Sequence, residues 1–137
     1  MDRVRIFIDS NIIISAIVYD RNELDIIKGL LQKGHQLVIS YHIHEEIFRV
    51  MLEKFPEYAV LVDENIRLFH LEIIPSNKYL DAVDQFDMVR DKYDRHVLAA
   101  AVASNCDLII TGDKDLLVLD SCRNIRILTS KGAKRYA

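Results

Sequence analysis

The side chains best suited to chemistry in this sequence are carboxylates that follow short apolar segments. Asp9 comes directly after the apolar residues 4–8, and Asp113 and Asp115 follow the apolar residues 108–110. Carboxylates that share one pocket repel one another, so a cluster of them is expected only where a cation neutralises it. Ligand sets made only of oxygen select hard ions. If these acids meet, we therefore expect them to form a Mg²⁺ or Mn²⁺ site.

Two more acids belong to the candidate set. Asp94 precedes an alanine-rich segment, 95–103, and Glu46 lies beside the apolar face of another predicted helix. Each acid has a simpler interpretation: three of them could be helix N-caps, and Glu46 could be a partly exposed helical residue. The four acids together are more informative than each one alone, because they can converge on one site. Two ions bound there, about 3.5–4 Å apart, could hold both the attacking water and the leaving oxygen of a phosphodiester.

Short apolar runs alternate along the chain with segments of helical periodicity. The strands are predicted at residues 4–8, 36–40, 71–74, 107–111 and 125–128. The helices are predicted at residues 12–18, 22–33, 41–55, 57–70, 94–105 and 113–119, and Gly34 is the predicted stop of the second. This alternation indicates an α/β fold in which a central parallel sheet lies between helical layers. Residues 76–90 show no clear pattern.

The predicted sheet explains how acids that are distant in sequence could meet. In open parallel sheets, functional groups gather outside the carboxyl ends of the strands, where the strand order reverses. Asp9 and Asp113 lie at that edge, Asp94 opens a helix there, and Glu46 can reach it from the helix after the second strand. We therefore predict one anionic pocket that only a divalent ion makes tolerable.

Length, composition and charge are those of one ordinary folded domain, predicted to span residues 1–137. Half of the residues are hydrophobic, but no apolar run approaches the roughly 20 residues of a membrane helix. The first residues lack a signal peptide, and Cys106 and Cys122 follow no metal-ligand spacing, which indicates reduced thiols and a cytoplasmic protein. The net charge of −3 neither excludes nor indicates a polyanionic partner.

Several other kinds of site are excluded by their missing motifs. The chain has no glycine-rich phosphate loop, no G-x-S-x-G element and no plausible Cys/His nucleophile pair. His42 and His44 are interpreted as surface or helix-start residues, and no zinc motif is present. His96, two residues after Asp94, could touch substrate or could be a semi-exposed helix residue. A phosphoacceptor receiver domain needs adjacent acids after its first strand. A dehalogenase-like phosphohydrolase needs D-x-D, but here the third residue is Asn11.

Four segments together resemble the PIN domain family across essentially the whole chain. They are "IFIDSNIIISA", "SYHIHEEIFRVM", "DRHVLAAAVASNCDLIITGDKDLL" and "IRILTS". Within the family, the chain is similar to the short, single-domain toxins of toxin–antitoxin pairs, the VapC-like ribonucleases. The resemblance implies a three-layer α/β/α fold and a nuclease that needs Mg²⁺ or Mn²⁺ to hydrolyse single-stranded RNA. It also implies a homodimer and a small antitoxin protein as partner.

The resemblance assigns roles to particular residues. The catalytic acids and metal ligands that it implies are Asp9, Glu46, Asp94 and Asp113, with Asp115 as a further metal ligand. Glu45 is a weaker choice than Glu46 for the glutamate of this set. Supporting positions are Asn11, Thr111 and Asp91, and the candidates for contact with RNA are Arg95 and Lys114.

Two alternatives keep the fold and change the function. The chain could be a catalytically weak PIN module that binds RNA or a protein, or it could be a housekeeping RNA-processing nuclease. The complete set of acids favours an active enzyme over a module that only binds.

Overall fold

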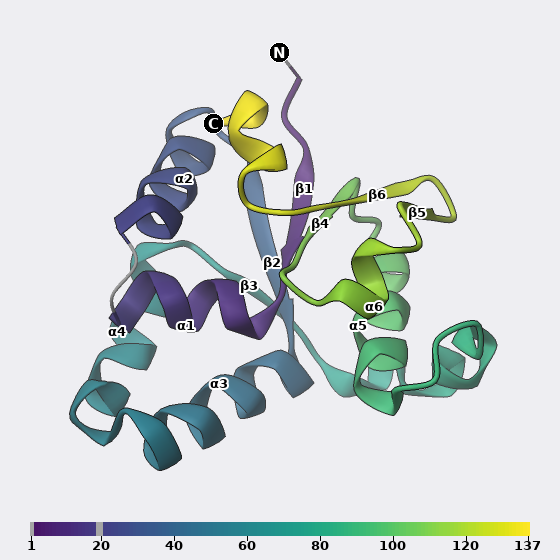
Figure 1. Ribbon diagram of the computed structural model, residues 1–137, viewed down its shortest axis with the longest axis horizontal. Coiled ribbons are helices and arrows are strands. Elements are labelled where there is room, and N and C mark those ends of the chain that lie inside the picture. The colour runs from purple at the N-terminus through teal and green to yellow at the C-terminus, as the bar shows by residue number, and fades with distance from the viewer. Residues whose placement is uncertain (1, 19–20) are drawn as a thin grey trace.

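A central sheet of six strands organises the chain (Figure 1). The structure is a computed structural model that describes residues 2–18 and 21–137. The strands are β1 (Arg5–Ile8), β2 (Gln36–Ser40), β3 (Glu72–Ile74), β4 (Leu108–Ile110), β5 (Ser121–Cys122) and β6 (Ile125–Leu128). Their order across the sheet is β3-β2-β1-β4-β6-β5. All pairings are parallel except that of β5 with β6.

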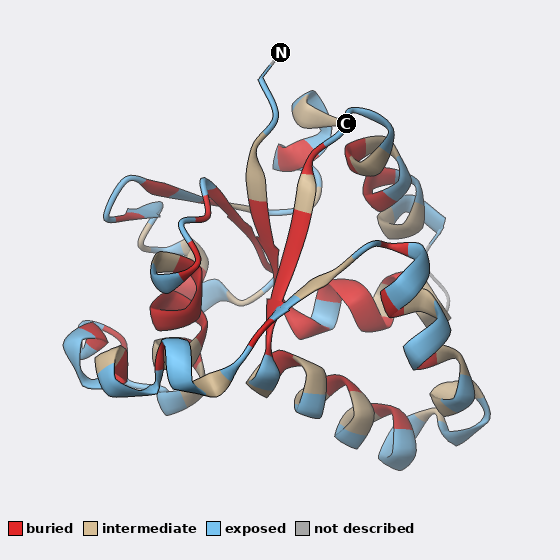
Figure 2. Ribbon diagram, turned by 180° about the vertical axis from the view of Figure 1, so that it is seen from behind, coloured by how far each residue is buried: buried red, intermediate tan, exposed pale blue. Residues whose placement is uncertain are grey.

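The central strands are buried on both faces, which is why they form from continuous apolar runs and not from alternating patterns. Phe7 of β1 lies opposite Val38 of β2 on one side and Ile109 of β4 on the other. None of these three side chains is exposed to solvent. Figure 2 shows the same burial along the strands and on the helix faces turned toward them.

Helices cover both faces of the sheet. They are α1 (Ser10–Val18), α2 (Arg21–Gln32), α3 (Tyr41–Lys54), α4 (Val62–Leu68), α5 (Lys92–Ala103) and α6 (Lys114–Leu117). The first four lie on one side of the strands, and α5 and α6 lie on the other (Figure 1). The predicted α/β architecture with a mainly parallel sheet is thereby confirmed. None of the described helices combines the length and apolar character needed to cross a membrane.

The strand order reverses beside β1. The chain moves outward from β1 to β2 and β3, and then returns to place β4 on the other side of β1. The carboxyl ends of β1 and β4 therefore flank the switch point, where open α/β sheets hold their ligands. Asp9 directly follows β1, and Asp113 follows β4 by three residues.

Some elements differ from the prediction. Residues 57–70 were expected to form one helix, but the structure has a 3-10 segment, η1 (Pro56–Leu61), followed by the short helix α4. Proline at the first helical position has no amide hydrogen to donate, and η1 packs against α3 instead of extending it. The two-residue antiparallel strand β5 and the C-terminal 3-10 segment η4 (Gly132–Tyr136) were not predicted.

The segment that showed no pattern in the sequence contains two 3-10 segments, η2 (Ser76–Lys78) and η3 (Leu80–Phe86). Val83 and Phe86 of η3 are buried, and η3 packs against α5. Because 3-10 turns have three residues per turn and short length, their apolar side chains do not produce the 3.6-residue periodicity of an α-helix.

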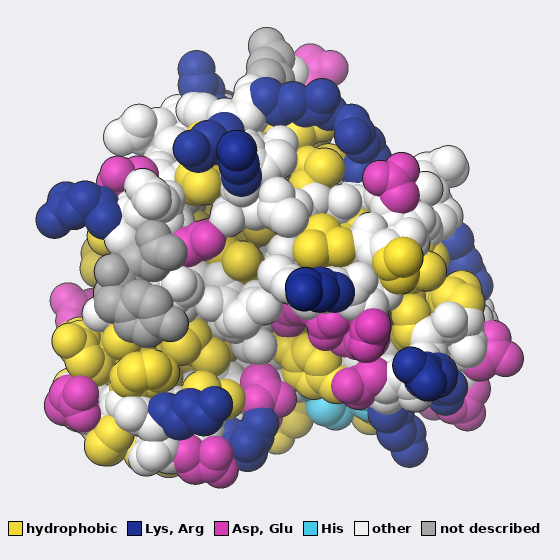
Figure 3. All heavy atoms as spheres, viewed as in Figure 1, with side chains coloured by type: hydrophobic (Ala, Val, Ile, Leu, Met, Phe, Trp, Pro, Cys, Tyr) yellow, Lys and Arg dark blue, Asp and Glu magenta, His cyan; other side chains and the backbone are white. Residues whose placement is uncertain are grey.

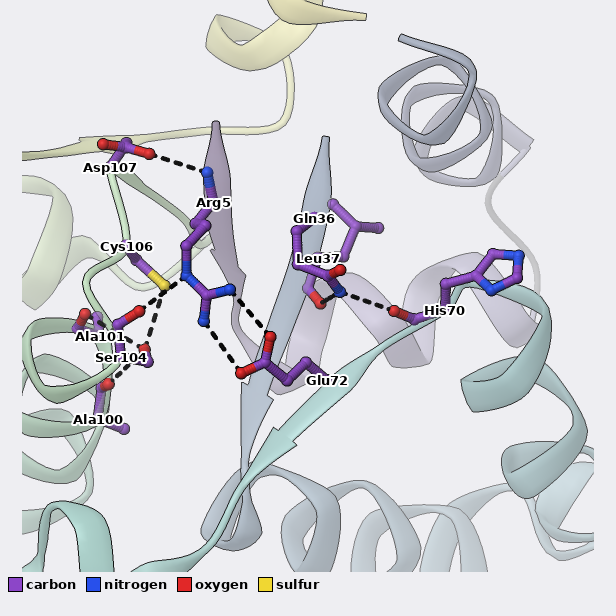
Figure 4. A network of polar contacts seen from close by, with 10 residues as sticks. All are labelled: Arg5, Gln36, Leu37, His70, Glu72, Ala100, Ala101, Ser104, Cys106 and Asp107. Atoms are coloured by element: carbon purple, nitrogen blue, oxygen red, sulfur yellow. Dashed lines mark hydrogen bonds and ion pairs between the residues drawn. The ribbon is translucent and has the colours of Figure 1, made fainter. Parts of the chain in front are cut away.

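A polar network joins the amino ends of the strands, as Figure 4 shows. The Arg5 guanidinium donates to both carboxylate oxygens of Glu72, at 2.9 and 3.1 Å, and its Nε donates to the carbonyl of Ser104 at 2.8 Å. The backbone N–H of Arg5 donates to Asp107 at 2.9 Å. These bonds tie β1 to β3 and to the turn before β4, at the edge of the sheet opposite the candidate acids.

His35 joins the two ends of the chain at the same edge. Its ring is buried, and its Nδ1 accepts a hydrogen bond from the backbone N–H of Val4 at 3.1 Å. A neutral imidazole has one donor and one acceptor nitrogen, so its Nε2 carries the hydrogen and donates to the carbonyl of Tyr136 at 3.1 Å. The contact holds η4 near the start of β1.

Candidate metal centre

Three acids from two separate elements converge beyond the carboxyl ends of the central strands. One carboxylate oxygen from each of Asp94, Asp113 and Asp115 lies within 4.8 Å of the others. Asp94 belongs to α5, Asp113 precedes α6, and Asp115 lies in its first turn. Figure 3 shows acidic side chains gathered on this face of the molecule. Oxygen donors at this spacing are the ligands that Mg²⁺ and Mn²⁺ prefer.

Asp94 is not a helix cap, which was its simpler interpretation. Helix α5 begins at Lys92, and its N-cap is Asp91, whose carboxylate accepts a hydrogen bond from the backbone N–H of Tyr93 at 2.8 Å. Asp91 is therefore the residue that caps this helix. Asp94 lies in the first turn, where it points inward and is 0% exposed.

The carboxylate of Asp94 lacks the partners that a buried charge needs. Neither of its oxygens accepts a hydrogen bond from any group in the part of the chain that the structure describes. Burial and the neighbouring carboxylate of Asp113 raise its pKa to about 8. An unpartnered buried carboxylate costs several kcal/mol unless it is protonated or paired with a cation. The residues present therefore fit a divalent ion.

Asp113 combines two roles that the sequence left as alternatives. Its Oδ1 caps α6 by accepting a hydrogen bond from the backbone N–H of Asp115 at 2.9 Å. A carboxylate has two oxygens, so capping does not prevent Asp113 from also contributing to the acidic group. The cap holds the turn that brings Asp113 and Asp115 together.

Asp9 is buried beside this group and is held by hydrogen bonds. Its Oδ2 accepts from the hydroxyl of Thr111 at 2.6 Å, and its Oδ1 accepts from the hydroxyl of Tyr93 at 2.7 Å and from the backbone N–H of Ser10 at 2.8 Å. Burial raises the pKa of Asp9, Asp113 raises it further, and these three donors oppose the shift. Asp9 is not one of the three described acids whose oxygens lie within 4.8 Å of one another.

Thr111 couples the two strand ends. Its hydroxyl donates to Asp9 and accepts from the backbone N–H of Asp113 at 3.0 Å. The side chain is fully buried. Thr111 thus lies between the acid that follows β1 and the acid that follows β4.

Glu46 does not join the acids that lie within 4.8 Å of one another in the described chain. It is partly buried on α3 and forms an ion pair with Arg49, one turn further along the helix. Its charge is close enough to raise the pKa of Tyr93, so it lies on the same side of the site. Glu45 is exposed.

Two cavities flank the site. One, of about 500 Å³, has a polar lining made of Ser10, Asn11, Ser15, Glu23, Lys54 and Gly112. Asn11 lies close to Gly112, because a Cβ built on that glycine would meet the Asn11 amide nitrogen at 2.9 Å. The other cavity, of about 550 Å³, is lined by residues of α3, including His42, Glu46 and Arg49, and by Tyr93.

The two basic candidates differ in their surroundings. Arg95 is partly buried, and its Nε donates to the carbonyl of Val89 at 2.8 Å, so it also holds the chain that leads into α5. Lys114 is exposed at the start of α6, between Asp113 and Asp115 in sequence. Of the two, Lys114 is the freer to meet a negatively charged ligand.

One feature of the site, and one contact beside it, were not predicted from the sequence. Tyr93 reaches Asp9 from the residue before Asp94, and no sequence motif marks it. His42 and His96 lie together, with ring centroids 4.2 Å apart, and the hydroxyl of Tyr79 is bonded to His42. The position of Tyr93 beside Asp9 could have been inferred from the sequence only if the start of α5 at Lys92 had been known.

Comparison with known proteins agrees with this geometry. The model of a PIN domain family matches residues 5–115 of the chain. Among solved structures, the chain is similar to a chain of VapBC2 from Rickettsia felis bound to a DNA fragment from their promoter. The two share 19% sequence identity with a TM-score of 0.63, over 90% of this chain and 96% of that chain. The curated proteins contain no match. With four fifths of its length matched by the family model and the same fold as VapBC2, this chain belongs to the PIN domain family.

Proposed function

We propose that the chain, as one nuclease domain over residues 1–137, is a Mg²⁺- or Mn²⁺-dependent endoribonuclease that hydrolyses phosphodiester bonds of single-stranded RNA. The observation that carries this proposal is Asp94, a buried carboxylate without a hydrogen-bond donor and with two further acids in ligand reach. Membership of the PIN family supports a nuclease.

The proposed division of labour follows from position. Asp94, Asp113 and Asp115 would hold the ion, and Asp9 would complete its surroundings from the end of β1. A divalent ion held there supplies positive charge for the phosphodiester and lowers the pKa of a coordinated water. Glu46 borders the site from α3 and, if released from Arg49, would be a further ligand or a proton acceptor.

The two cavities beside the acids are where single-stranded RNA would lie. Ser10 lines one cavity and Tyr93 lines the other, and their side chains are joined by a hydrogen bond, so an extended strand that occupied both cavities would pass close to the acids. Lys114 beside the acids and Lys54 in the first cavity would contact phosphates, and Arg95 would do so after releasing Val89. With a net charge of −3, the protein must obtain its RNA affinity from the ion and from such local cations.

Cleavage of labelled single-stranded RNA by the full chain tests the proposal. We expect cleavage with Mn²⁺, no cleavage in EDTA, and at least about 100-fold slower cleavage by Asp9→Asn, Asp94→Asn or Asp113→Asn. Asp25→Asn on α2, an exposed acid, is the matched control and should cleave at the wild-type rate. Cleavage in EDTA, or equal rates for wild type and Asp94→Asn, would contradict the assignment.

A toxin role in a toxin–antitoxin pair is a further part of the proposal, supported by the fold shared with VapBC2. Expression of the wild type in a bacterial host should stop growth, whereas Asp94→Asn should not. Co-expression of a small protein encoded beside this chain should relieve the arrest. Normal growth with a demonstrably active enzyme would favour the housekeeping nuclease instead. We also propose a cytoplasmic homodimer, which sedimentation of the purified chain can test.

One observation favours a second candidate, a catalytically weak PIN module that binds RNA or protein. Glu46 forms an ion pair with Arg49 and does not join the group of acids. If this pair persists with ion and RNA, the ligand set is incomplete. The variant Arg49→Ala separates the two cases, because it should leave an active enzyme at least as fast as wild type and should give activity to a module that Arg49 silences.

A further inference from the structure

The hydroxyl of Tyr93 is hydrogen-bonded to two other side chains and forms the middle of a short hydrogen-bond network. It is 2.7 Å from Oδ1 of Asp9 and 2.8 Å from Oγ of Ser10. Tyr93 is the second residue of α5, whereas Asp9 and Ser10 follow β1, more than 80 residues earlier in the sequence. The contact therefore joins the helix that carries Asp94 to the end of the central strand.

The direction of these hydrogen bonds follows from the groups themselves. An ionised carboxylate can only accept, so the single hydrogen of the Tyr93 hydroxyl is donated to Asp9. The Tyr93 oxygen then accepts the hydrogen of Ser10 Oγ. A donor that itself accepts a hydrogen bond is polarised and donates more strongly. Ser10 thus supports the bond that Tyr93 makes to Asp9.

This hydrogen-bond network restrains two acids at once. Tyr93 and the Ser10 amide hold Oδ1 of Asp9, and Thr111 holds Oδ2, so the carboxylate plane cannot rotate freely. Asp94 is the next residue after Tyr93, and a fixed Tyr93 fixes the first turn of α5 from which Asp94 projects. Partners that orient metal ligands in this way typically contribute 10- to 100-fold to metal affinity or activity.

We propose that Tyr93 is a positioning residue of the metal centre, which holds Asp9 and Asp94 in the relative arrangement that a divalent cation requires. The inference rests on the proposed function, since it assumes that these acids bind an ion. Nothing in the chemistry requires Tyr93 to touch the ion or the RNA. Its hydroxyl acts through Asp9, and its ring forms part of the wall of the cavity beside Glu46.

Mn²⁺ affinity, measured at one fixed pH from the electron paramagnetic resonance signal of free Mn²⁺, tests this inference without any RNA. We expect Tyr93→Phe to bind Mn²⁺ at least about 10-fold more weakly than wild type. Ser10→Ala, which removes only the support, should weaken binding by a smaller factor. The matched control is Tyr79→Phe, which also removes a buried hydroxyl, but one that bonds His42 and not an acid, and which should bind like wild type.

Circular dichroism and the melting temperature in EDTA establish that each variant folds, and Ser10→Ala keeps the test decisive if Tyr93→Phe does not. In RNA cleavage at subsaturating Mn²⁺, kcat of Tyr93→Phe should fall about 10-fold while KM for RNA stays at the wild-type value. Wild-type Mn²⁺ affinity in both Tyr93→Phe and Ser10→Ala, with Asp9→Asn weakened, would overturn this inference alone.

Two other outcomes also contradict the positioning role. If Tyr93→Phe equals wild type but Tyr93→Leu loses RNA affinity, the ring and not the hydroxyl is the functional part. If wild type itself binds no Mn²⁺, the proposed function fails, and this inference fails with it.

Discussion

Asp94 shows most directly how one side chain can set the behaviour of the site. Its folded-state pKa of about 8 lies well above the usual carboxyl value, because the group is buried and Asp113 is next to it. Without an ion, the folded state holds a proton on Asp94 that the unfolded state releases at a lower pH. Stability from this group is therefore present at acidic pH and is lost as the pH rises toward 8.

The variant Asp94→Asn should remove this dependence. In EDTA, we expect it to be more stable than wild type above pH 7, by on the order of a few kcal/mol, since each unit of pKa shift corresponds to about 1.4 kcal/mol. The difference should shrink toward pH 4. Urea unfolding at several pH values measures it, and a difference that does not change with pH would show that Asp94 is not titrating in the folded state.

The individual acids were accessible from the sequence because each follows a recognisable strand or opens a recognisable helix. Asp9, Asp94 and Asp113 were predicted to share one edge, and they lie there. Tyr93 was not predicted, because its role depends on α5 beginning at Lys92, two residues earlier than expected. The Glu46–Arg49 pair was not predicted either, since i,i+3 spacing permits such a pair but does not show which partner Glu46 takes.

Helix α6 illustrates how a short element depends on one residue. It has only four residues, and Asp113 caps it. Asparagine caps helices about as well as aspartate, whereas alanine costs about 1 kcal/mol. Asp113→Asn and Asp113→Ala therefore separate the cap from the charge.

Both Asp113 variants should bind Mn²⁺ at least about 10-fold more weakly than wild type. In EDTA, Asp113→Asn should be no less stable than wild type, because it keeps the cap and removes a repelling charge beside Asp94. Asp113→Ala should be less stable than Asp113→Asn by about 1 kcal/mol. Equal stability of the two variants would indicate that the cap contributes nothing. Calorimetric titration and thermal unfolding give the two quantities.

Elements with strong periodicity were predicted correctly, and those that depend on tertiary contacts were not. The apolar run of β1 and the alanine-rich face of α5 specify their own structure. The 3-10 segments η1 and η3 have apolar residues without α-helical spacing, so their form depends on packing against α3 and α5. Strand β5 has two residues and exists only because a tight turn pairs it with β6.

Across the fold, the acids connect the two helical layers. Asp9 lies between β1 and α1, whereas Asp94 lies in α5 and Asp113 caps α6. Helix α1 and the pair α5 and α6 lie on opposite sides of the sheet (Figure 1). An ion bound among them would link both layers through the central strand. Its binding energy would then oppose unfolding of the entire domain and not only of a local turn.

Mn²⁺ should therefore raise the melting temperature of the wild type in proportion to the logarithm of its concentration. At about 100 times the dissociation constant, the stabilisation should be about 2.7 kcal/mol. Differential scanning calorimetry measures it, with NaCl of equal ionic strength as the control. Asp94→Asn should show a much smaller rise. A rise of equal size in that variant would place the responsible ion elsewhere.

His35 bonds both Val4 and Tyr136 and so brings residues near the two termini together, at the amino ends of the strands and away from the acids. A short peptide linker joining them would disturb no strand, and new ends could be opened at the exposed turn Arg123–Asn124. Such a circular permutant would keep β1 at the centre of the sheet. It would also let a fluorescent reporter be attached at the new ends while the carboxylates remain intact.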